Sequence, residues 1–344
     1  MKRPKILIVY TGGTIGMIEN QVTGALEPFN FNHLIDNVPK IKMLDFDIQH
    51  LQFDTPIDSS DMNPDHWSEI ARIIEKHYDA VDGFVVLHGT DTMAYTASAL
   101  SFMLGNLHQP VIITGSQLPI GEVRTDGEEN LITALQIAAS TNPDGTPTVQ
   151  EVAILFENYL WRGNRSTKMS ADNFNAFKSN NYPSLAKIGL GIHFNADALM
   201  RHTTIRPLEV RCQMDTAVMF LDLHPGIRES TLLHQLHTPG IKGIVLKTFG
   251  AGNTPTAAWF MDAIGDAVER GIVVMNVTQC VNGPVNQRYV SAGRLAEVGV
   301  VSGHDLTSEA AITKLMYLFG LGLAPEEVKQ YLSRSLAGEI TLPQ

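Results

Sequence analysis

Four short runs of β-branched and other apolar residues, each ending in a polar or glycine-rich turn, place the strongest limit on the fold of this chain. The runs are KILIVY, GFVVL, PVIIT and EVAILF, which begin at Lys5, Gly83, Pro110 and Glu151. Apolar and polar residues hardly alternate within them, so we expect strands that are buried on both faces. Segments of helical pattern separate the runs. The chain is therefore predicted to be α/β, with a parallel sheet covered by helices.

One of the intervening helices carries clear boundary signals. Asn63 is a typical N-cap residue, Pro64 fits the first helical position, and Asp65 would lie in the first turn. This helix is expected to end near Tyr78. The other elements predicted in this half are a strand at 47–53 and helices at 92–104 and about 127–140.

A second block of alternating elements begins near Met214. Its predicted strands are AVMFLDL, GIVLKTFG and GIVVMNVTQ, and Gly271 is expected to act as the C-cap of the helix that precedes the third strand. A length of 344 residues suits two domains of ordinary size. We expect a larger N-terminal domain over 1–195, a linker over 196–213 and a smaller C-terminal α/β domain over 214–344.

Composition excludes several classes of protein. The net charge of −11 gives no electrostatic reason to bind nucleic acid. The two cysteines, Cys212 and Cys280, are too few for a disulfide framework or a four-cysteine metal site, and they suit a reducing compartment such as the cytoplasm. The apolar run near the N-terminus is too short for a signal peptide or a membrane span. We therefore expect a cytoplasmic protein with neither a nucleic-acid nor a membrane partner.

The first glycine-rich turn, TGGTIG, is a candidate for either a phosphate-binding loop or a site with a nucleophile. A dinucleotide fingerprint ending at Gly16 would need glycine at position 11, which is Thr11, and no GxxxxGK[ST] motif occurs in the chain. Glycines let the backbone approach a ligand closely. Thr14 could then be a hydroxyl nucleophile with backbone N–H groups beside it, or simply a helix N-cap.

Two further loops carry short polar side chains. The sequence HGTDT follows the predicted strand at 83–87, where Asp91 could hold a substrate ammonium and Thr90 could supply a second hydroxyl. The sequence DSSD supplies Ser59 and Ser60, which suit a small carboxylate. Helix capping and a local turn are the structural alternatives. Loops at the carboxyl ends of parallel strands line one crevice, so the three loops are expected to converge.

A hydroxyl nucleophile also needs a group that accepts its proton. The motifs GxSxG and HExxH are absent, which argues against an α/β-hydrolase and a zinc protease. His88, at a strand end, is best interpreted as structural. Lys168 is the remaining candidate base, because burial can lower a lysine pKa towards neutrality, but the residues alone do not select it.

An ordered set of motifs nevertheless makes the sequence recognisable. TGGTIG, DSSDM, HGTDTMAYTAS, TGSQLP, RTDGEENL, RGNRSTKMSAD and GAGNTP together closely resemble the bacterial cytoplasmic, type I L-asparaginases of the asparaginase/glutaminase family. The resemblance covers essentially the whole chain. It implies a larger parallel-sheet domain and a smaller flavodoxin-like domain, no metal or organic cofactor, and hydrolysis of L-asparagine to L-aspartate and ammonia. It also implies a homo-oligomer, a dimer or a tetramer, in which GAGNTP with Asn253 faces a neighbouring subunit.

The resemblance assigns roles to individual residues. Thr14 matches the family nucleophile, which attacks the side-chain amide carbon and forms a β-aspartyl ester. Thr90, Asp91 and Lys168 match a second polar triad, in which Lys168 shifts protons or activates Thr90, and Asp91 orients the substrate through its ammonium. The remaining matches, which bind the substrate α-carboxylate and neighbouring groups, are Asp58, Ser59 and Ser60.

One loop and one single position depart from the pattern of many relatives. The loop MIENQVTGALEPFNF, residues 17–31, contains no tyrosine, although many relatives use one there to assist the nucleophile, and the nearest is Tyr10 in the preceding strand. Position 247 is Lys247 where relatives that respond to asparagine at a second site can have arginine, so no allostery is predicted.

Other functions remain open on the sequence alone. The nearest is a broader glutaminase-asparaginase, because a binding pocket gains only about 1–3 kcal/mol of discrimination against one additional methylene. The second is a non-catalytic amino-acid sensor. A subunit of an archaeal tRNA-dependent amidotransferase ranks lower.

Overall fold

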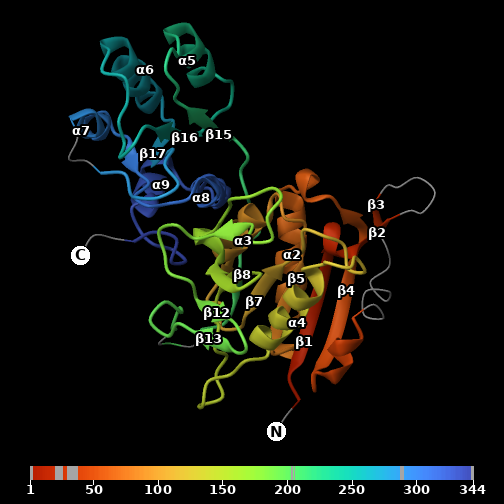
Figure 1. Ribbon diagram of the computed structural model, residues 1–344. Helices are drawn as coiled ribbons and strands as arrows, with labels where there is room; N and C mark the ends of the chain where they lie inside the picture. The colour runs from red at the N-terminus through yellow and green to blue at the C-terminus, as the bar shows by residue number, and fades with distance from the viewer. Residues whose placement is uncertain are drawn as a thin grey trace. The chain divides into compact units, whose positions relative to one another are not determined.

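The computed structural model describes residues 3–19, 26–28, 38–202, 204, 206–286 and 290–341 (Figure 1). The chain divides into two compact units, Met1–Cys212 and Gln213–Gln344. Each unit has its own mainly or wholly parallel sheet and its own apolar core. The α/β class predicted from the sequence is confirmed.

The sheet of the N-terminal unit has eight strands in the order β13-β12-β9-β8-β7-β5-β1-β4. Five of them run parallel, as the buried β-branched runs predict: β4 (Asp47–Ile57), β1 (Lys5–Gly12), β5 (Gly83–Leu87), β7 (Val111–Thr114) and β8 (Val152–Phe156). Three short antiparallel strands extend the sheet beyond β8: β9 (Tyr159–Arg162), β12 (Ala186–Ile188) and β13 (Ile192–Phe194). Three or four residues give too little periodicity to predict such strands.

Three long helices cover the two faces of this sheet: α2 (Pro64–His77), α3 (Met93–Met103) and α4 (Gly127–Ala138). Helix α2 begins as predicted, because Asn63 Oδ1 accepts hydrogen bonds from two N–H groups of the first turn. Helix α4 packs on the face formed by Ile6, Ile8 and Tyr10, and α2 and α3 lie on the other side of the sheet (Figure 1).

The remaining elements among the described residues of this unit are short. They are η1 (Thr14–Gly16), β2 (Met17–Glu19), β3 (Leu26–Pro28), η2 (Pro39–Met43), η3 (Ser59–Asp61), η4 (Tyr78–Ala80), β6 (Leu104–Gly105), η5 (Gly163–Arg165), β10 (Thr167–Lys168), β11 (Phe177–Lys178) and β14 (Glu209–Val210). Strands β2 and β3 pair antiparallel inside the loop 17–31 that contains no tyrosine. The rest of that loop, 20–25 and 29–31, lies outside the described residues.

The segment expected to be a linker, 196–213, is packed into the N-terminal unit up to residue 212. A buried ion pair explains why. Glu151 accepts a hydrogen bond from Arg162 Nε at 2.6 Å and another from Met200 N at 2.7 Å, and Arg162 donates to Ala198 O at 2.9 Å. Because buried charges need partners, the carboxylate and the guanidinium hold the start of the segment, at Ala198 and Met200, against the sheet. Further along, β14 pairs with β6.

The C-terminal unit contains a parallel four-stranded sheet in the order β15-β16-β17-β18. Its strands are β15 (Val218–Asp222), β16 (Gly243–Thr248), β17 (Val273–Thr278) and β18 (Val301–Ser302). Its helices are α5 (Glu229–Leu236), α6 (Ala258–Glu269), α7 (Val290–Glu297), α8 (Ser308–Gly320) and α9 (Pro325–Leu332). Gly271 follows α6 with a φ of 89°, a left-handed conformation that suits the C-cap predicted for it.

A fully buried ion pair fixes the C-terminal segment of this unit. Lys314 Nζ on α8 lies 2.6 Å from Glu339 Oε1, and neither side chain is exposed. Lys314 also donates to the Arg334 carbonyl at 2.6 Å, and Glu339 accepts from the N–H groups of Leu336 and Ala337. Burial opposes ionisation of Glu339, but Lys314 and these N–H groups together hold its pKa below the usual value.

Replacing Lys314 with methionine should therefore unfold this unit more easily. The substitution leaves the Glu339 carboxylate buried without its cation, which costs about 3–5 kcal/mol in comparable cases. Urea unfolding of the variant measures the loss. The control is the double variant Lys314→Met with Glu339→Leu, which removes both charges and should lose clearly less. Equal losses in the single and double variants would contradict the assignment of the cost to an unpaired charge.

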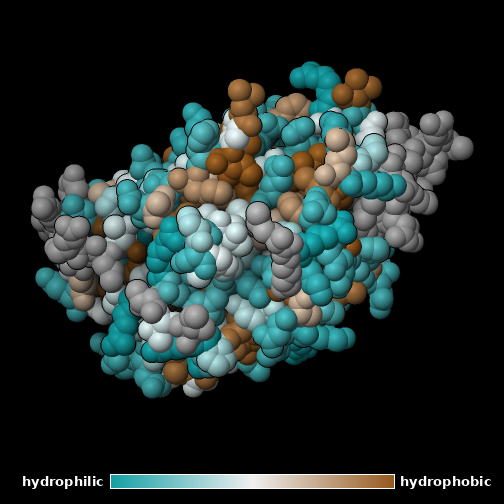
Figure 2. Space-filling view, turned by 90° about the horizontal axis from the view of Figure 1, so that it is seen from below, coloured by the Kyte–Doolittle hydropathy of each residue, from teal (hydrophilic) through white to brown (hydrophobic). Residues whose placement is uncertain are grey.

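In Figure 2, hydrophobic residues of the described part of the chain lie among hydrophilic ones. The exposed large hydrophobic side chains among the described residues include Val123 and Leu190. Within the described ranges, none of the helices has the length and apolar character needed to span a bilayer.

Candidate active site

Three loops meet at the carboxyl ends of β1, β4 and β5, and glycines make the contact. A Cβ atom on Gly13 would overlap the backbone of Gly89, and one on Gly89 would lie 2.5 Å from Ser59 Oγ. Any larger residue at these two positions would push the loops apart. The loops that carry Thr14, Thr90 and Ser59 are therefore adjacent, which is the convergence expected from the sequence.

Thr14 is the first residue of the short helix η1, and it is partly buried. The residue before it, Gly13, has a φ of 87°, a conformation that favours glycine. Beneath the turn, the hydroxyl of Tyr10 donates to the carbonyl of Gly16 at 3.0 Å. Burial raises the pKa of Tyr10 to about 12, so this phenol keeps its proton and acts as a support for the turn.

Lys168 joins the second loop. Its Nζ lies 2.8 Å from Thr90 Oγ1 and 2.6 Å from Asp91 Oδ1. The Lys168 side chain is 17% exposed, whereas 63% of the Asp91 side chain faces solvent. The structure thus brings together Thr90, Asp91 and Lys168, which are separated by up to 78 residues in the sequence. One ammonium group contacts a hydroxyl that can react and a carboxylate that can bind a cation.

The polar side chains of the third loop differ in their exposure to solvent. Ser59 is buried, and its Oγ accepts a hydrogen bond from Asp91 N at 3.3 Å while its carbonyl accepts one from Thr92 Oγ1 at 2.6 Å. Asp58 and Ser60 are exposed, and Asp58 Oδ1 accepts from both the N–H and the hydroxyl of Ser60 at 2.9 Å. Ser59 therefore holds the second loop in place. Binding of a carboxylate by Asp58, Ser59 and Ser60 stays a prediction.

A fourth loop follows β7 and carries the motif TGSQLP. A Cβ on Gly115 would overlap the His88 carbonyl oxygen, so this loop touches the second one. Its backbone is held by Asp126, a buried carboxylate that accepts from the N–H groups of Gln117 and Leu118 at 3.0 and 3.1 Å. No local pattern in the sequence links Asp126 to residues eight or nine positions earlier.

His88 is a structural residue, as the sequence favours. It is fully buried; its Nδ1 lies 2.6 Å from Gly89 O and its Nε2 lies 2.8 Å from Thr96 Oγ1. Desolvation lowers its pKa to about 4, although the bond to Gly89 O acts in the opposite direction. The imidazole is therefore neutral at neutral pH.

The buried imidazole should make the protein less stable in mild acid. An unfolded histidine titrates near pH 6.5, and the folded pKa is about 4. Between these values the unfolded chain binds more protons, so stability that is complete above pH 6.5 falls as the pH drops towards 4, by up to about 3 kcal/mol. Urea unfolding at pH 7.5 and pH 5 measures the change. The variant His88→Asn should show a smaller difference between the two pH values; an identical difference would refute the assignment.

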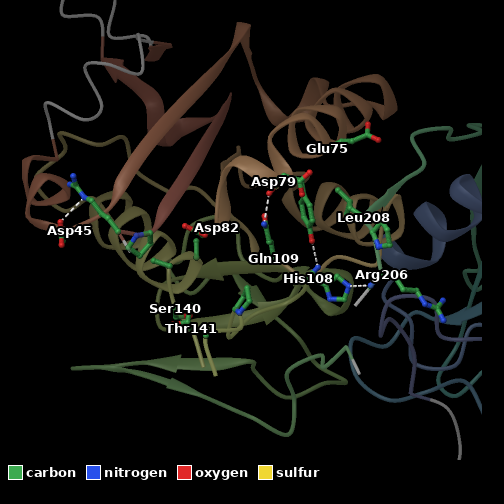
Figure 3. A pocket seen from close by; sticks show the side chains of 18 residues that line it. Asp45, Glu75, Asp79, Asp82, His108, Gln109, Ser140, Thr141, Arg206 and Leu208 are labelled. Carbon is green, nitrogen blue, oxygen red and sulfur yellow. Dashed lines mark hydrogen bonds and ion pairs between the residues drawn. The ribbon is translucent and has the colours of Figure 1, made fainter. Parts of the chain in front are cut away.

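A groove of about 1180 Å³ lies at the opposite, amino-terminal edge of the strands. Its lining includes Asp45, Asp82 and Gln109, which precede β4, β5 and β7 (Figure 3). Several polar groups there already have protein partners: Arg3 pairs with Asp45 at 3.1 Å, and His108 Nε2 accepts from the N–H of Arg206. The groove shares no residue with the four converging loops.

A metal site is not formed by the described residues, because no three His, Cys, Asp or Glu side chains among them are grouped to hold an ion.

The fold and the site together define an α/β enzyme with a hydroxyl-lined site at the carboxyl ends of parallel strands. Comparison with known proteins agrees with this class. Residues 5–200 match the family model described as "Asparaginase, N-terminal", and residues 217–332 match "Glutaminase/Asparaginase C-terminal domain".

Individual relatives are similar along the whole chain. It is 42% identical over 357 residues to L-asparaginase 1 of Escherichia coli strain K12, with 99% of both chains covered. The crystal structure of L-asparaginase I from Vibrio cholerae matches with a TM-score of 0.90 and 40% identity, over 99% of this chain and 100% of that one. A mouse protein named 60 kDa lysophospholipase is 40% identical over 363 residues, which cover 98% of this chain and 63% of the mouse protein. The chain belongs to the asparaginase/glutaminase family.

Proposed function

We propose that this protein hydrolyses the side-chain amide of L-asparagine to L-aspartate and ammonia. The observation that carries the proposal is the contact of Lys168 Nζ with both Thr90 Oγ1 and Asp91 Oδ1 beside the turn of Thr14. An exposed carboxylate next to reactive hydroxyls suits a substrate that carries an ammonium group. The similarity to L-asparaginase 1 of Escherichia coli supports the choice of amide.

In the first step of the proposed reaction, Thr14 Oγ adds to the amide carbon of the substrate. The carbon–nitrogen bond then breaks, and the proton from the Thr14 hydroxyl leaves with the nitrogen as ammonia. The product is a β-aspartyl ester of Thr14. Backbone N–H groups of the glycine-rich turns stabilise the oxyanion of the tetrahedral intermediate.

In the second step, water adds to the ester carbon and the bond to Thr14 Oγ breaks, which releases L-aspartate and restores the hydroxyl. Thr90 and Lys168 lie within hydrogen-bond distance of each other, so they can relay the proton that water gives up. Asp91 binds the substrate ammonium. Asp58, Ser59 and Ser60 are assigned to the substrate α-carboxylate and the groups around it.

Ammonia release by the purified protein tests the proposal. L-Asparagine and L-glutamine are assayed in parallel, because a pocket discriminates weakly against one additional methylene. Release from L-asparagine supports the proposed function, and the ratio of the two rates separates an asparaginase from a broader glutaminase-asparaginase. If calorimetry detects L-asparagine binding but no ammonia appears, the protein is a sensor on the same scaffold and the proposal fails.

We also propose that the protein is a cytoplasmic homo-oligomer, a dimer or a tetramer. The two free cysteines, one exposed and one partly buried, support a reducing compartment. The segment that carries Asn253, assigned to a subunit contact, is a tight loop closed by two backbone hydrogen bonds between Phe249 and Asn253. Sedimentation at several protein concentrations tests the assembly, and a monomer throughout would refute it.

A further inference from the structure

Three buried side chains from different elements form a hydrogen-bonded series that ends at the second loop. Trp67 Nε1 on α2 lies 2.9 Å from Thr96 Oγ1 on α3, and Thr96 Oγ1 lies 2.8 Å from His88 Nε2. His88 Nδ1 in turn lies 2.6 Å from Gly89 O. His88 and Thr96 have no exposed surface, and Trp67 is 5% exposed. The proposed reaction assigns no role to these residues.

The chemistry of the two ends fixes the position of every hydrogen in the series. Indole N–H can only donate, and a carbonyl oxygen can only accept. Thr96 therefore accepts from Trp67 and donates its own hydrogen to His88 Nε2, and His88 donates from Nδ1 to Gly89 O. A single neutral tautomer of His88 satisfies both of its neighbours.

Thr96 differs in this respect from the two serines of its helix, Ser98 and Ser101. Ser98 and Ser101 donate to carbonyls of α3 itself, Ala94 O and Ala97 O, both at 2.7 Å. Such local bonds are the common state of a hydroxyl in a helix. The hydroxyl of Thr96 is directed away from its own helix and towards His88.

The bond from His88 reaches the peptide that joins Gly89 to Thr90. A peptide unit is planar, so holding the Gly89 carbonyl also fixes the direction of the Thr90 N–H and the start of the Thr90 backbone. Asp91 has separate support, because its N–H and the Thr92 hydroxyl both bind Ser59. The series therefore acts on Thr90 more than on Asp91.

We propose that Trp67, Thr96 and His88 are positioning residues that orient the Gly89–Thr90 peptide, and with it the Thr90 hydroxyl, for the hydrolytic reaction. The inference rests on the proposed function. Loss of these hydrogen bonds should lower turnover, which depends on Thr90. It should leave substrate affinity, which depends on Asp91 and the third loop, nearly unchanged.

Paired substitutions at Thr96 test the proposal. Thr96→Val removes the hydroxyl and keeps the shape, and we expect kcat for ammonia release to fall about ten-fold with KM within about two-fold of the original, since a ten-fold change corresponds to the loss of one buried hydrogen bond. Thr96→Ser restores the hydroxyl and should recover most of the turnover. Two controls are matched. Ser98→Ala removes a buried hydroxyl from the same helix, and Thr313→Val makes the same change at a buried helical threonine that donates to its own helix. Neither should alter kcat.

A second measurement keeps this inference separate from the proposed function. The nitrogen chemical shifts of the His88 imidazole, assigned by comparison with a His88→Asn sample, should show a hydrogen on Nδ1 and an acceptor at Nε2 in the original protein, and should change in Thr96→Val. A hydrogen on Nε2 instead would overturn the inference whatever the activity. So would an unchanged kcat in Thr96→Val, or a loss that Thr96→Ser does not restore. Absence of ammonia release from the original protein refutes the proposed function itself.

Discussion

Replacing Thr14 with valine should abolish ammonia release while leaving substrate binding in place. Valine has nearly the shape of threonine but no hydroxyl, so the ester of the first step cannot form. We expect kcat to fall by at least about 1,000-fold, in line with the removal of a nucleophile from other hydrolases. Thr14 is only partly buried in a short turn, so the free energy of unfolding should change by less than about 1 kcal/mol.

Two measurements make this prediction specific. Calorimetry with L-asparagine should show binding to Thr14→Val, because Asp91 and the third loop are unchanged. Thr14→Ser keeps a hydroxyl and should retain measurable turnover. If Thr14→Val hydrolyses asparagine at the original rate, the nucleophile is another group, and the hydroxyl of Thr90 becomes the first alternative to examine.

Replacing Lys168 with methionine should cost most of the activity and little of the stability. The ammonium of Lys168 lies 2.8 Å from Thr90 Oγ1. Without it, Thr90 loses the neighbouring group with which it can exchange a proton, so we expect kcat to fall about 100- to 1,000-fold. The ion pair with Asp91 is largely exposed on the carboxylate side, and such pairs contribute at most about 1 kcal/mol. Steady-state kinetics and urea unfolding measure the two effects.

Two further variants show what Lys168 contributes. Lys242→Met removes an ion pair of similar length, 2.7 Å to Asp215 in the C-terminal unit, and should leave the activity unchanged. Lys168→Arg keeps the positive charge, but a guanidinium does not release a proton at neutral pH. Strong activity in Lys168→Arg would contradict proton transfer by Lys168 and would assign it a purely electrostatic role.

The parts of the site that the sequence predicts are those with a local signal. Thr14 and Thr90 each follow a buried strand and a glycine, a pattern that spans about ten residues. Only the resemblance selects Lys168, and the structure places it against Thr90 and Asp91. The parallel order of the central strands also follows from local pattern, since runs buried on both faces alternate with helices.

The supports of the site could not be predicted, because their partners are distant in sequence. Thr96 lies within an apolar helix and contacts Trp67, 29 residues earlier. Asp126 holds the loop that follows β7 across eight or nine residues. Hydrophobic periodicity reports which face of an element is buried, but it carries no information about which buried polar groups meet.

The hydrogen bonds of the Glu151 carboxylate determine where a fragment of the N-terminal unit can be cut. A fragment of the N-terminal unit cut at residue 195, where the sequence suggests the domain ends, would lose the Met200 N–H that binds Glu151 and the Ala198 carbonyl that binds Arg162. A fragment cut at residue 212 keeps both. The two fragments differ by only 17 residues, yet the shorter one leaves a buried charge network incomplete. The longer fragment is thus the one to express when the four converging loops are studied in isolation.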